Sequence, residues 1–146
     1  MKKPLPKPSR KFHKFLKVTL GNYLTRKFNV KADTGGLEKV DPPYIVIANH
    51  PGFWDPFILS AFAPYPVQYV ASDTYFRKPL LRILLRLVGA FPKSKFMADA
   101  STVKTILHVK KQGGVIGIFP EGSREWDGRT EELLYPTAKL IKSLKI

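Results

Sequence analysis

Three short runs of apolar, mostly β-branched residues place the strongest constraint on how this chain can fold. They are YIVIA at 44–48, VQYVA at 67–71 and VIGIF at 115–119. Runs of this length are short for helices, and their nearly continuous apolar character is typical of strands covered on both faces. Longer segments with helical spacing separate them. The sequence therefore predicts an α/β fold with a mostly parallel or mixed central sheet flanked by helices.

The segments around the strands carry helix signals. We expect a helix of two to three turns from Asp55, followed by helices at 74–88, 99–112 and 133–146. Pro64 and Pro66 end the first of these, because proline cannot continue a helix. The Gly113–Gly114 pair ends the third.

The first 33 residues hold most of the chain's positive charge. The net charge is +14, and this segment has ten Lys and Arg residues against the single acid Asp33. From Arg10 onward, apolar residues recur every three or four positions between lysines, which predicts a basic amphipathic helix that bends near Gly21–Asn22. Two interpretations remain open: the apolar face packs on the protein core, or it lies among the headgroups of a bilayer.

Composition excludes several classes of site. The chain has no Cys, which rules out disulfides, a thiol nucleophile and a Cys-ligated metal. Apolar runs are too short for a conventional transmembrane span, and the basic N-terminal segment lacks the continuous apolar core of a secretory signal. A strong positive charge predicts a polyanionic partner, which could be nucleic acid, an anionic lipid surface or a phosphorylated substrate. No recognised nucleic-acid-binding pattern accompanies the charge.

The loop after the first predicted strand holds a candidate acid–base pair. In NHPGFWDP at 49–56, His50 and Asp55 are close enough in sequence for the carboxylate to reach the imidazole. A carboxylate bound to one ring nitrogen leaves the other as a base that can deprotonate an alcohol. The alternative is that Asp55 only caps its helix and His50 only bonds at the strand end. A metal site is not expected, because His13 and His108 fall in distant predicted helices.

Two further segments offer groups that suit a phosphate. FPEGSR at 119–124 follows the third predicted strand and supplies Arg124 beside Gly122, where a ligand can approach the backbone. GAFPKSK at 89–95 follows the apolar helix and presents Lys93 and Lys95. Taken alone, each of these segments is more typical of a solvated turn than of a binding site.

In this order and spacing, the three segments resemble the motifs of the glycerolipid acyltransferases, the group that includes 1-acylglycerol-3-phosphate acyltransferase. NHPGFWDP is similar to the family's H-x-x-x-x-D motif, FPEGSR matches its third motif, and GAFPKSK is similar to its second. The resemblance covers roughly residues 12–146. It implies an O-acyltransferase that moves a fatty acyl group from acyl-CoA or acyl carrier protein to a lysophospholipid hydroxyl.

The resemblance also implies roles for particular residues. His50 would be the general base, with Asp55 holding it. The acceptor, expected to be 1-acylglycerol-3-phosphate giving phosphatidic acid, would bind the following residues: Glu121, Gly122, Ser123, Arg124, Lys93 and Lys95. Phe53 and Trp54 would line the pocket. No metal and no cofactor beyond the thioester co-substrate is implied.

On this basis we expect a basic membrane-surface segment at 1–33 and an acyltransferase domain at 34–146 that lacks its usual C-terminal part. The protein would be peripheral or monotopic on the cytoplasmic face of a membrane. Two alternatives stay open: an anionic-lipid-binding module of the same fold with impaired catalysis, and a nucleic-acid-binding protein suggested by charge alone.

Overall fold

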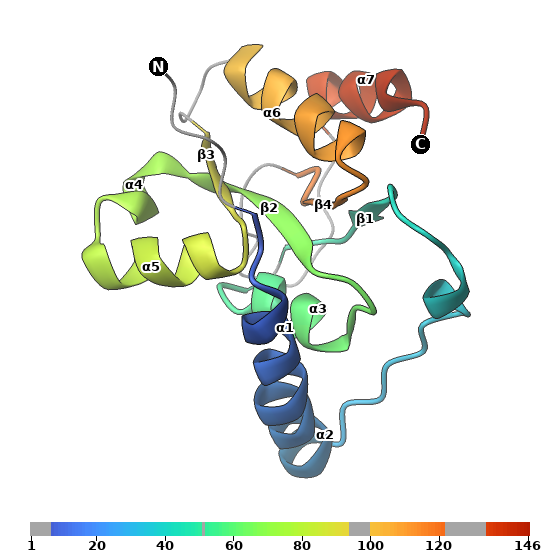
Figure 1. The fold of residues 1–146 in the computed structure, drawn as a ribbon, viewed down its shortest axis with the longest axis vertical. Coiled ribbons are helices and arrows are strands. Elements are labelled where there is room, and N and C mark those ends of the chain that lie inside the picture. The colour runs from blue at the N-terminus through green and yellow to red at the C-terminus, as the bar shows by residue number, and fades with distance from the viewer. Residues whose placement is uncertain (1–6, 51, 94–99, 122–133) are drawn as a thin grey trace.

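The computed structural model describes residues 7–50, 52–93, 100–121 and 134–146. A four-stranded sheet lies between helices on its two faces (Figure 1). Its strands are β1 (Ile45–Ile47), β2 (Val67–Ser72), β3 (Phe91–Lys93) and β4 (Val115–Ile118). They lie in the order β1-β4-β2-β3, and all three neighbouring pairs are parallel. The predicted α/β fold class is confirmed.

Strand β3 is the element that the sequence did not predict. It consists of three residues, with Val70 of β2 opposite Phe91 and Ser72 opposite Lys93. Its central residue is Pro92, which has no N–H to donate and is therefore tolerated only on an edge strand such as this one. GAFPKSK is thus partly a strand rather than a loop.

Most of the predicted helices are present. They are α3 (Asp55–Phe62), α6 (Ala100–Lys111) and α7 (Tyr135–Leu144). The single helix predicted at 74–88 is wrong, because the structure has α4 (Asp73–Phe76) and α5 (Pro79–Leu87) instead. Lys78 between them is extended, at φ −85° and ψ 120°, because a residue before proline is disfavoured in the helical region.

The basic N-terminal segment forms one helical rod with a wide turn in its middle. It comprises α1 (Arg10–Leu16), the π-helical η1 (Lys17–Gly21) and α2 (Asn22–Phe28); a short 3-10 helix, η2 (Leu37–Lys39), follows. The side chain of Ser9 caps α1 by accepting a hydrogen bond from the backbone N–H of Phe12 at 3.2 Å. The irregularity expected near Gly21–Asn22 is this π-helical turn. Leu16 and Leu24 are buried, so one side of the rod packs on the protein.

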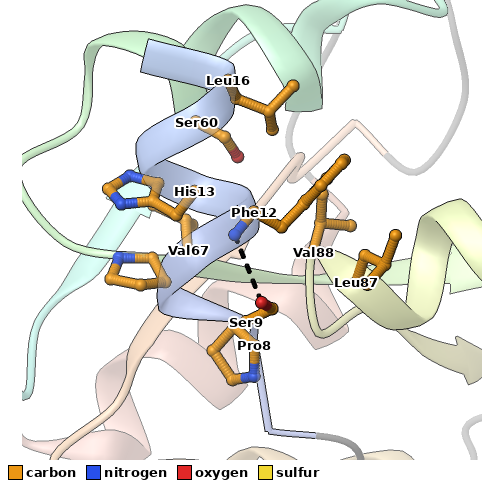
Figure 2. A pocket seen from close by; sticks show the side chains of 10 residues that line it. Pro8, Ser9, Phe12, His13, Leu16, Ser60, Val67, Leu87 and Val88 are labelled. Carbon is orange, nitrogen blue, oxygen red and sulfur yellow. Dashed lines mark hydrogen bonds between the residues drawn. The ribbon is translucent and has the colours of Figure 1, made fainter. Parts of the chain in front are cut away.

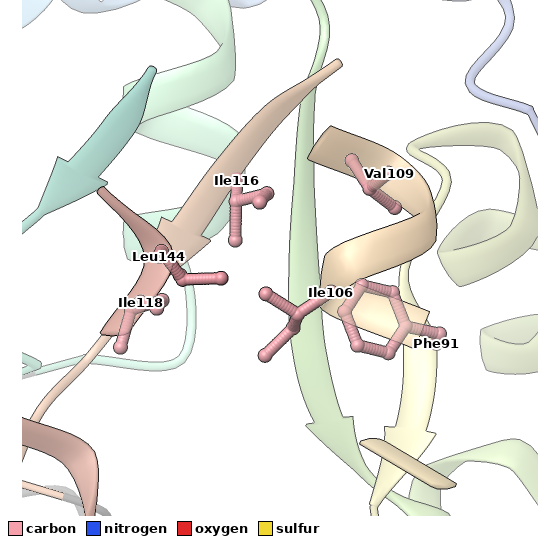
Figure 3. Close-up of a cluster of buried hydrophobic side chains, with 6 residues drawn as sticks. All are labelled: Phe91, Ile106, Val109, Ile116, Ile118 and Leu144. Carbon is pink, nitrogen blue, oxygen red and sulfur yellow. The ribbon is translucent and has the colours of Figure 1, made fainter. Parts of the chain in front are cut away.

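Side chains alternate along the strands and fill a core on each face of the sheet. On the face covered by α6 and α7, Figure 3 shows a tight cluster of Phe91, Ile106, Val109, Ile116, Ile118 and Leu144. The opposite face packs against α1, α3 and α5 through two further clusters. Their buried members are Leu16, Phe57, Val88 and Ala90 in one, and Tyr44, Val67, Tyr69 and Val115 in the other.

Gly117 in β4 makes room for the largest fully buried side chain. Tyr69 projects from β2, and a Cβ at Gly117 would lie 2.3 Å from its Cε1 atom. The same Cβ would lie 2.9 Å from Cγ1 of Val67. Carbon atoms that are not bonded to each other do not approach so closely, so any larger residue forces the Tyr69 ring or the strand to move.

We predict that Gly117→Ala lowers the free energy of unfolding by about 1–3 kcal/mol through overpacking. Gly21→Ala is the matched control, since its Cβ would meet only ordinary contacts at 3.5 Å or more. Alanine favours a helical position, so this control should be neutral or stabilising by up to about 1 kcal/mol. Urea unfolding measures both, and equal effects would contradict the packing argument.

His13 lies where α1 crosses α3 and β2. Figure 2 shows it beside a small cavity of about 10 Å³ whose wall includes Ser60 and Val67. Burial lowers the pKa of His13, and the nearby positive charge of Lys17 lowers it further; backbone carbonyls of Ser60 and Ala63 act in the opposite direction. Among the described residues, its Nε2 atom has no hydrogen-bond partner. The imidazole is therefore favoured in its neutral form.

A lowered pKa of His13 predicts a pH-dependent stability. The unfolded chain binds more protons at this site, so the stabilisation is complete above about pH 6.5 and is lost as pH falls toward the folded-state pKa. In His13→Gln this part of the acid sensitivity should disappear. Urea unfolding of both proteins at about pH 7.5 and about pH 5.5 measures it. Identical pH dependence in the two proteins would show that His13 contributes nothing.

Candidate active site

The candidate site lies at the carboxyl ends of two adjacent strands, where parallel α/β sheets place their ligands. His50 follows β1, and Glu121 follows β4. The pairing of these strands continues beyond their ends, because the N–H of Ala48 donates to the carbonyl of Ile118 at 3.3 Å. The two loops that follow are therefore brought together by the sheet itself.

His50 and Asp55 contact each other as their spacing predicts. Nδ1 of His50 lies 2.9 Å from Oδ2 of Asp55, and both side chains are about one-fifth exposed. The N–H of Gly52 donates to the same carboxylate oxygen at 2.8 Å, which holds the loop closed. Asp55 is the first residue of α3, whose N-cap is Trp54, so the carboxylate does not act as the cap. When Nδ1 carries the proton and donates it to Asp55, Nε2 is left as an acceptor.

Two aromatic rings fix the plane of the imidazole. Phe119 stacks on His50 with 4.1 Å between ring centroids and 19° between planes. Phe119 also stacks on Tyr69, with 5.8 Å between ring centroids and 13° between planes. Phe119 was not predicted from the sequence as a site residue. Its position directly after a buried strand, in the same segment as Glu121, is the signal that would have identified it.

Glu121 joins the two loops from within the protein. Its side chain is buried, with 5% of the residue's surface exposed, and Oε2 accepts a hydrogen bond from the backbone N–H of His50 at 3.2 Å. Among the described residues, Oε1 has no partner. The sequence predicted that Glu121 contacts the ligand; the contact found in the structure is with the backbone of His50.

The sequence predicted five further site residues. Gly122, Ser123, Arg124 and Lys95 lie outside the described residues. Lys93 is the last residue of β3, so it lies at the same carboxyl-terminal end of the sheet as His50 and Glu121. Strand β2, however, lies between β3 and β4. Strand spacing puts β3 roughly 10 Å from β4. The structure thus brings His50, Asp55 and Glu121 together, and Lys93 lies farther away at the same end of the sheet.

An open hollow adjoins Asp55. It has a volume of about 140 Å³, and its other lining residues are Ala48, Asn49, Ile58 and Leu59. Nearby, Phe53 packs against Trp54 at 5.4 Å between ring centroids, and the ring of Trp54 remains largely exposed. Within the part of the chain that the structure describes, no cluster of His, Cys, Asp or Glu could hold a metal. The site can thus supply a base beside an apolar surface.

Comparison with known proteins gives a consistent result. A family model described as Acyltransferase matches residues 26–141. The 1-acyl-sn-glycerol-3-phosphate acyltransferase of Bacillus subtilis is 30% identical over 114 residues, which cover 75% of this chain and 53% of that protein. The enzyme of the same name from Streptococcus pneumoniae is 34% identical over 95 residues, which cover 63% of this chain and 36% of that enzyme. The chain therefore spans about half, or less, of the length of these relatives.

A solved structure shares the fold. The crystal structure of PlsC from Thermotoga maritima, a 1-acyl-sn-glycerophosphate acyltransferase, superimposes with a TM-score of 0.67 at 19% identity. The match covers 93% of this chain and 56% of that one. It supports the arrangement of strands and helices seen here.

The bond between Glu121 and the backbone of His50 can be tested by hydrogen exchange. We predict faster amide exchange at 48–50 in Glu121→Leu, which has no acceptor for the His50 N–H. Glu121→Gln keeps an acceptor oxygen of the same reach and should retain most of the protection. Mass spectrometry of exchanged peptides measures both variants. Equal protection in Glu121→Leu and the parent would show that this bond does not hold the loop.

Proposed function

The chain belongs to the acyltransferase family, and we propose that it moves a fatty acyl group from a thioester to the free hydroxyl of a lysophospholipid. The observation that carries the proposal is the 2.9 Å contact between His50 and Asp55 at the carboxyl end of β1. The names of the relatives favour 1-acylglycerol-3-phosphate as the acceptor, giving phosphatidic acid. Acyl-CoA or acyl carrier protein would be the donor.

The proposed mechanism uses the imidazole as a general base. Asp55 accepts a hydrogen bond from Nδ1–H of His50, and Nε2 takes the proton of the acceptor hydroxyl as its oxygen attacks the thioester carbonyl. The new ester C–O bond forms and the C–S bond breaks. The thiolate then leaves, and the proton taken from the hydroxyl stays on Nε2. No acyl-enzyme is needed, which suits a chain that has no Cys. We propose no metal or redox cofactor, because the thioester already supplies an activated acyl group.

We propose that the acceptor's phosphate binds at the segment that follows Glu121. Arg124 would provide a forked donor for phosphate oxygens, with Gly122 and Ser123 beside it. Lys93 and Lys95 would add positive charge. Support comes from Glu121, the residue preceding this segment, whose carboxylate contacts the backbone of His50. Glu121 would position His50 and leave Oε1 for the acceptor's glycerol.

We further propose that the helical rod at 10–28 rests on the membrane that contains the acceptor, on the cytoplasmic face. Apolar side chains on its outer side are about half or more exposed: Phe15, Val18, Tyr23 and Phe28. Basic residues interleave with them, and this combination favours an anionic headgroup region. Across the described residues, no helix combines the length and apolar character that a membrane span requires.

The central test is His50→Ala. We expect acyl transfer to fall by about 10²–10⁴-fold, because the hydroxyl loses its base, while the circular dichroism spectrum stays unchanged. Asp55→Asn should also impair transfer by leaving the imidazole wrongly oriented. His108→Ala, an exposed histidine on α6, is the matched control and should keep full activity. The assay is CoA release from acyl-CoA with detergent-dispersed 1-acylglycerol-3-phosphate, and unchanged turnover in His50→Ala would refute the mechanism.

A second candidate is a lipid-binding module without catalysis. It is favoured by the basic, apolar outer side of the helical rod. In that case the unmodified protein would sediment with anionic vesicles yet consume no thioester in the same assay.

A further inference from the structure

Helix α5 exposes an apolar edge that the core does not use. None of its residues is buried, although Leu84 and Leu85 pack against the cluster around Val88. Two other side chains are largely exposed, Leu80 by 82% and Ile83 by 57%, whereas Leu87, 36% exposed, lines the small cavity beside Phe12 and Val88 (Figure 2). The spacing of three residues places Leu80 and Ile83 on the same side of the helix.

Positive charge lies directly beside this edge. Arg82 and Arg86 are four residues apart and exposed, so they form a second row along the helix next to the apolar one. Lys78 and Arg77 precede the helix. The acid nearest in sequence, Asp73, lies 3.7 Å from Arg77, and no further Asp or Glu occurs before Asp99. The surface is therefore apolar and cationic at the same time.

A surface that is both apolar and cationic favours one kind of binding partner. Soluble proteins rarely leave a row of large aliphatic side chains exposed, and such a row marks an interaction surface. An anionic bilayer offers acyl chains to the aliphatic side chains and phosphates to the arginines in the same plane.

The helix is also attached to the proposed membrane-facing rod. The N–H of Ser9, which caps α1, donates to the carbonyl of Leu87 at 3.0 Å, and Phe12 packs on the same cluster as Leu84. Figure 1 shows α5 at the periphery of the molecule with its end close to the start of α1. The end of α5 is therefore held next to the start of the rod.

We propose that α5 is a second membrane-binding element, which inserts Leu80 and Ile83 at the headgroup boundary of an anionic bilayer while Arg82 and Arg86 bind lipid phosphates. The proposal deepens the proposed function by naming where the bilayer contacts the protein, and it rests on that function only in taking a membrane as the partner. It requires no catalysis.

The absence of cysteine makes a direct probe possible. Leu80→Cys in the full chain is labelled with an environment-sensitive fluorophore, and Tyr135→Cys, at a residue 77% exposed on α7, is the matched control. Vesicles are phosphatidylcholine alone or an equimolar mixture with phosphatidylglycerol. We expect a blue shift at position 80 with the anionic vesicles and none at position 135.

The arginines are tested by matched charge removal. Arg82→Gln with Arg86→Gln should weaken binding to the anionic vesicles by roughly tenfold or more, since each basic residue near such a surface contributes to binding. Lys104→Gln with Lys111→Gln removes the same charge from exposed positions of α6 and should weaken it much less. An equal loss in both variants would show that only net charge matters and would overturn the proposal.

Three other outcomes would also overturn it. The protein could fail to bind anionic vesicles, or it could sediment with them while the probe at position 80 stays in water. The probe could also be shielded before vesicles are added, which would mean that another part of the chain or a second copy covers α5. Acyl transfer with detergent-dispersed acceptor is measured in parallel, so a failure of the membrane contact is distinguished from a failure of the proposed function.

Discussion

The candidate site depends on a stack of three aromatic rings that extends from the core to the surface. Tyr69 is buried against the backbone of Gly117, Phe119 lies flat on Tyr69, and His50 lies flat on Phe119. Because each ring is supported by the one beneath it, the plane of the imidazole is set by the packing between β2 and β4. The strand that carries Gly117 also continues into the segment with Glu121, so the same element supports the site from two directions.

Two hydrogen bonds also hold His50 in place. Asp55 contacts the imidazole from the start of α3, and Glu121 holds the backbone of His50 from the end of β4. The first bond closes a local loop of six residues, whereas the second joins positions 71 residues apart. An imidazole held in this way would need little rearrangement to accept a proton, as the proposed mechanism requires.

These contacts also explain which features the sequence could predict. The strands at 45–47, 67–72 and 115–118 follow from apolar runs, and the contact between His50 and Asp55 follows from loop length. Strand β3 could not be predicted in this way, because three residues around Pro92 carry no strand pattern and depend on β2 for pairing. The break at Lys78 was overlooked since apolar spacing continues through Pro79. The aromatic stack and the Glu121 contact join distant segments, so they become visible only when the sheet is assembled.

The π-helical turn at Lys17–Gly21 has a consequence for how the N-terminal rod keeps two distinct sides. Leu16 and Leu24 are eight residues apart, and in an uninterrupted α-helix that separation would rotate one about 80° away from the other. The wider turn unwinds the chain and brings both leucines onto the buried side. Phe15 and Tyr23 have the same spacing, and both are exposed. The π-helical turn thus accommodates one extra residue, so that the buried side of the rod stays aligned from Leu16 to Leu24.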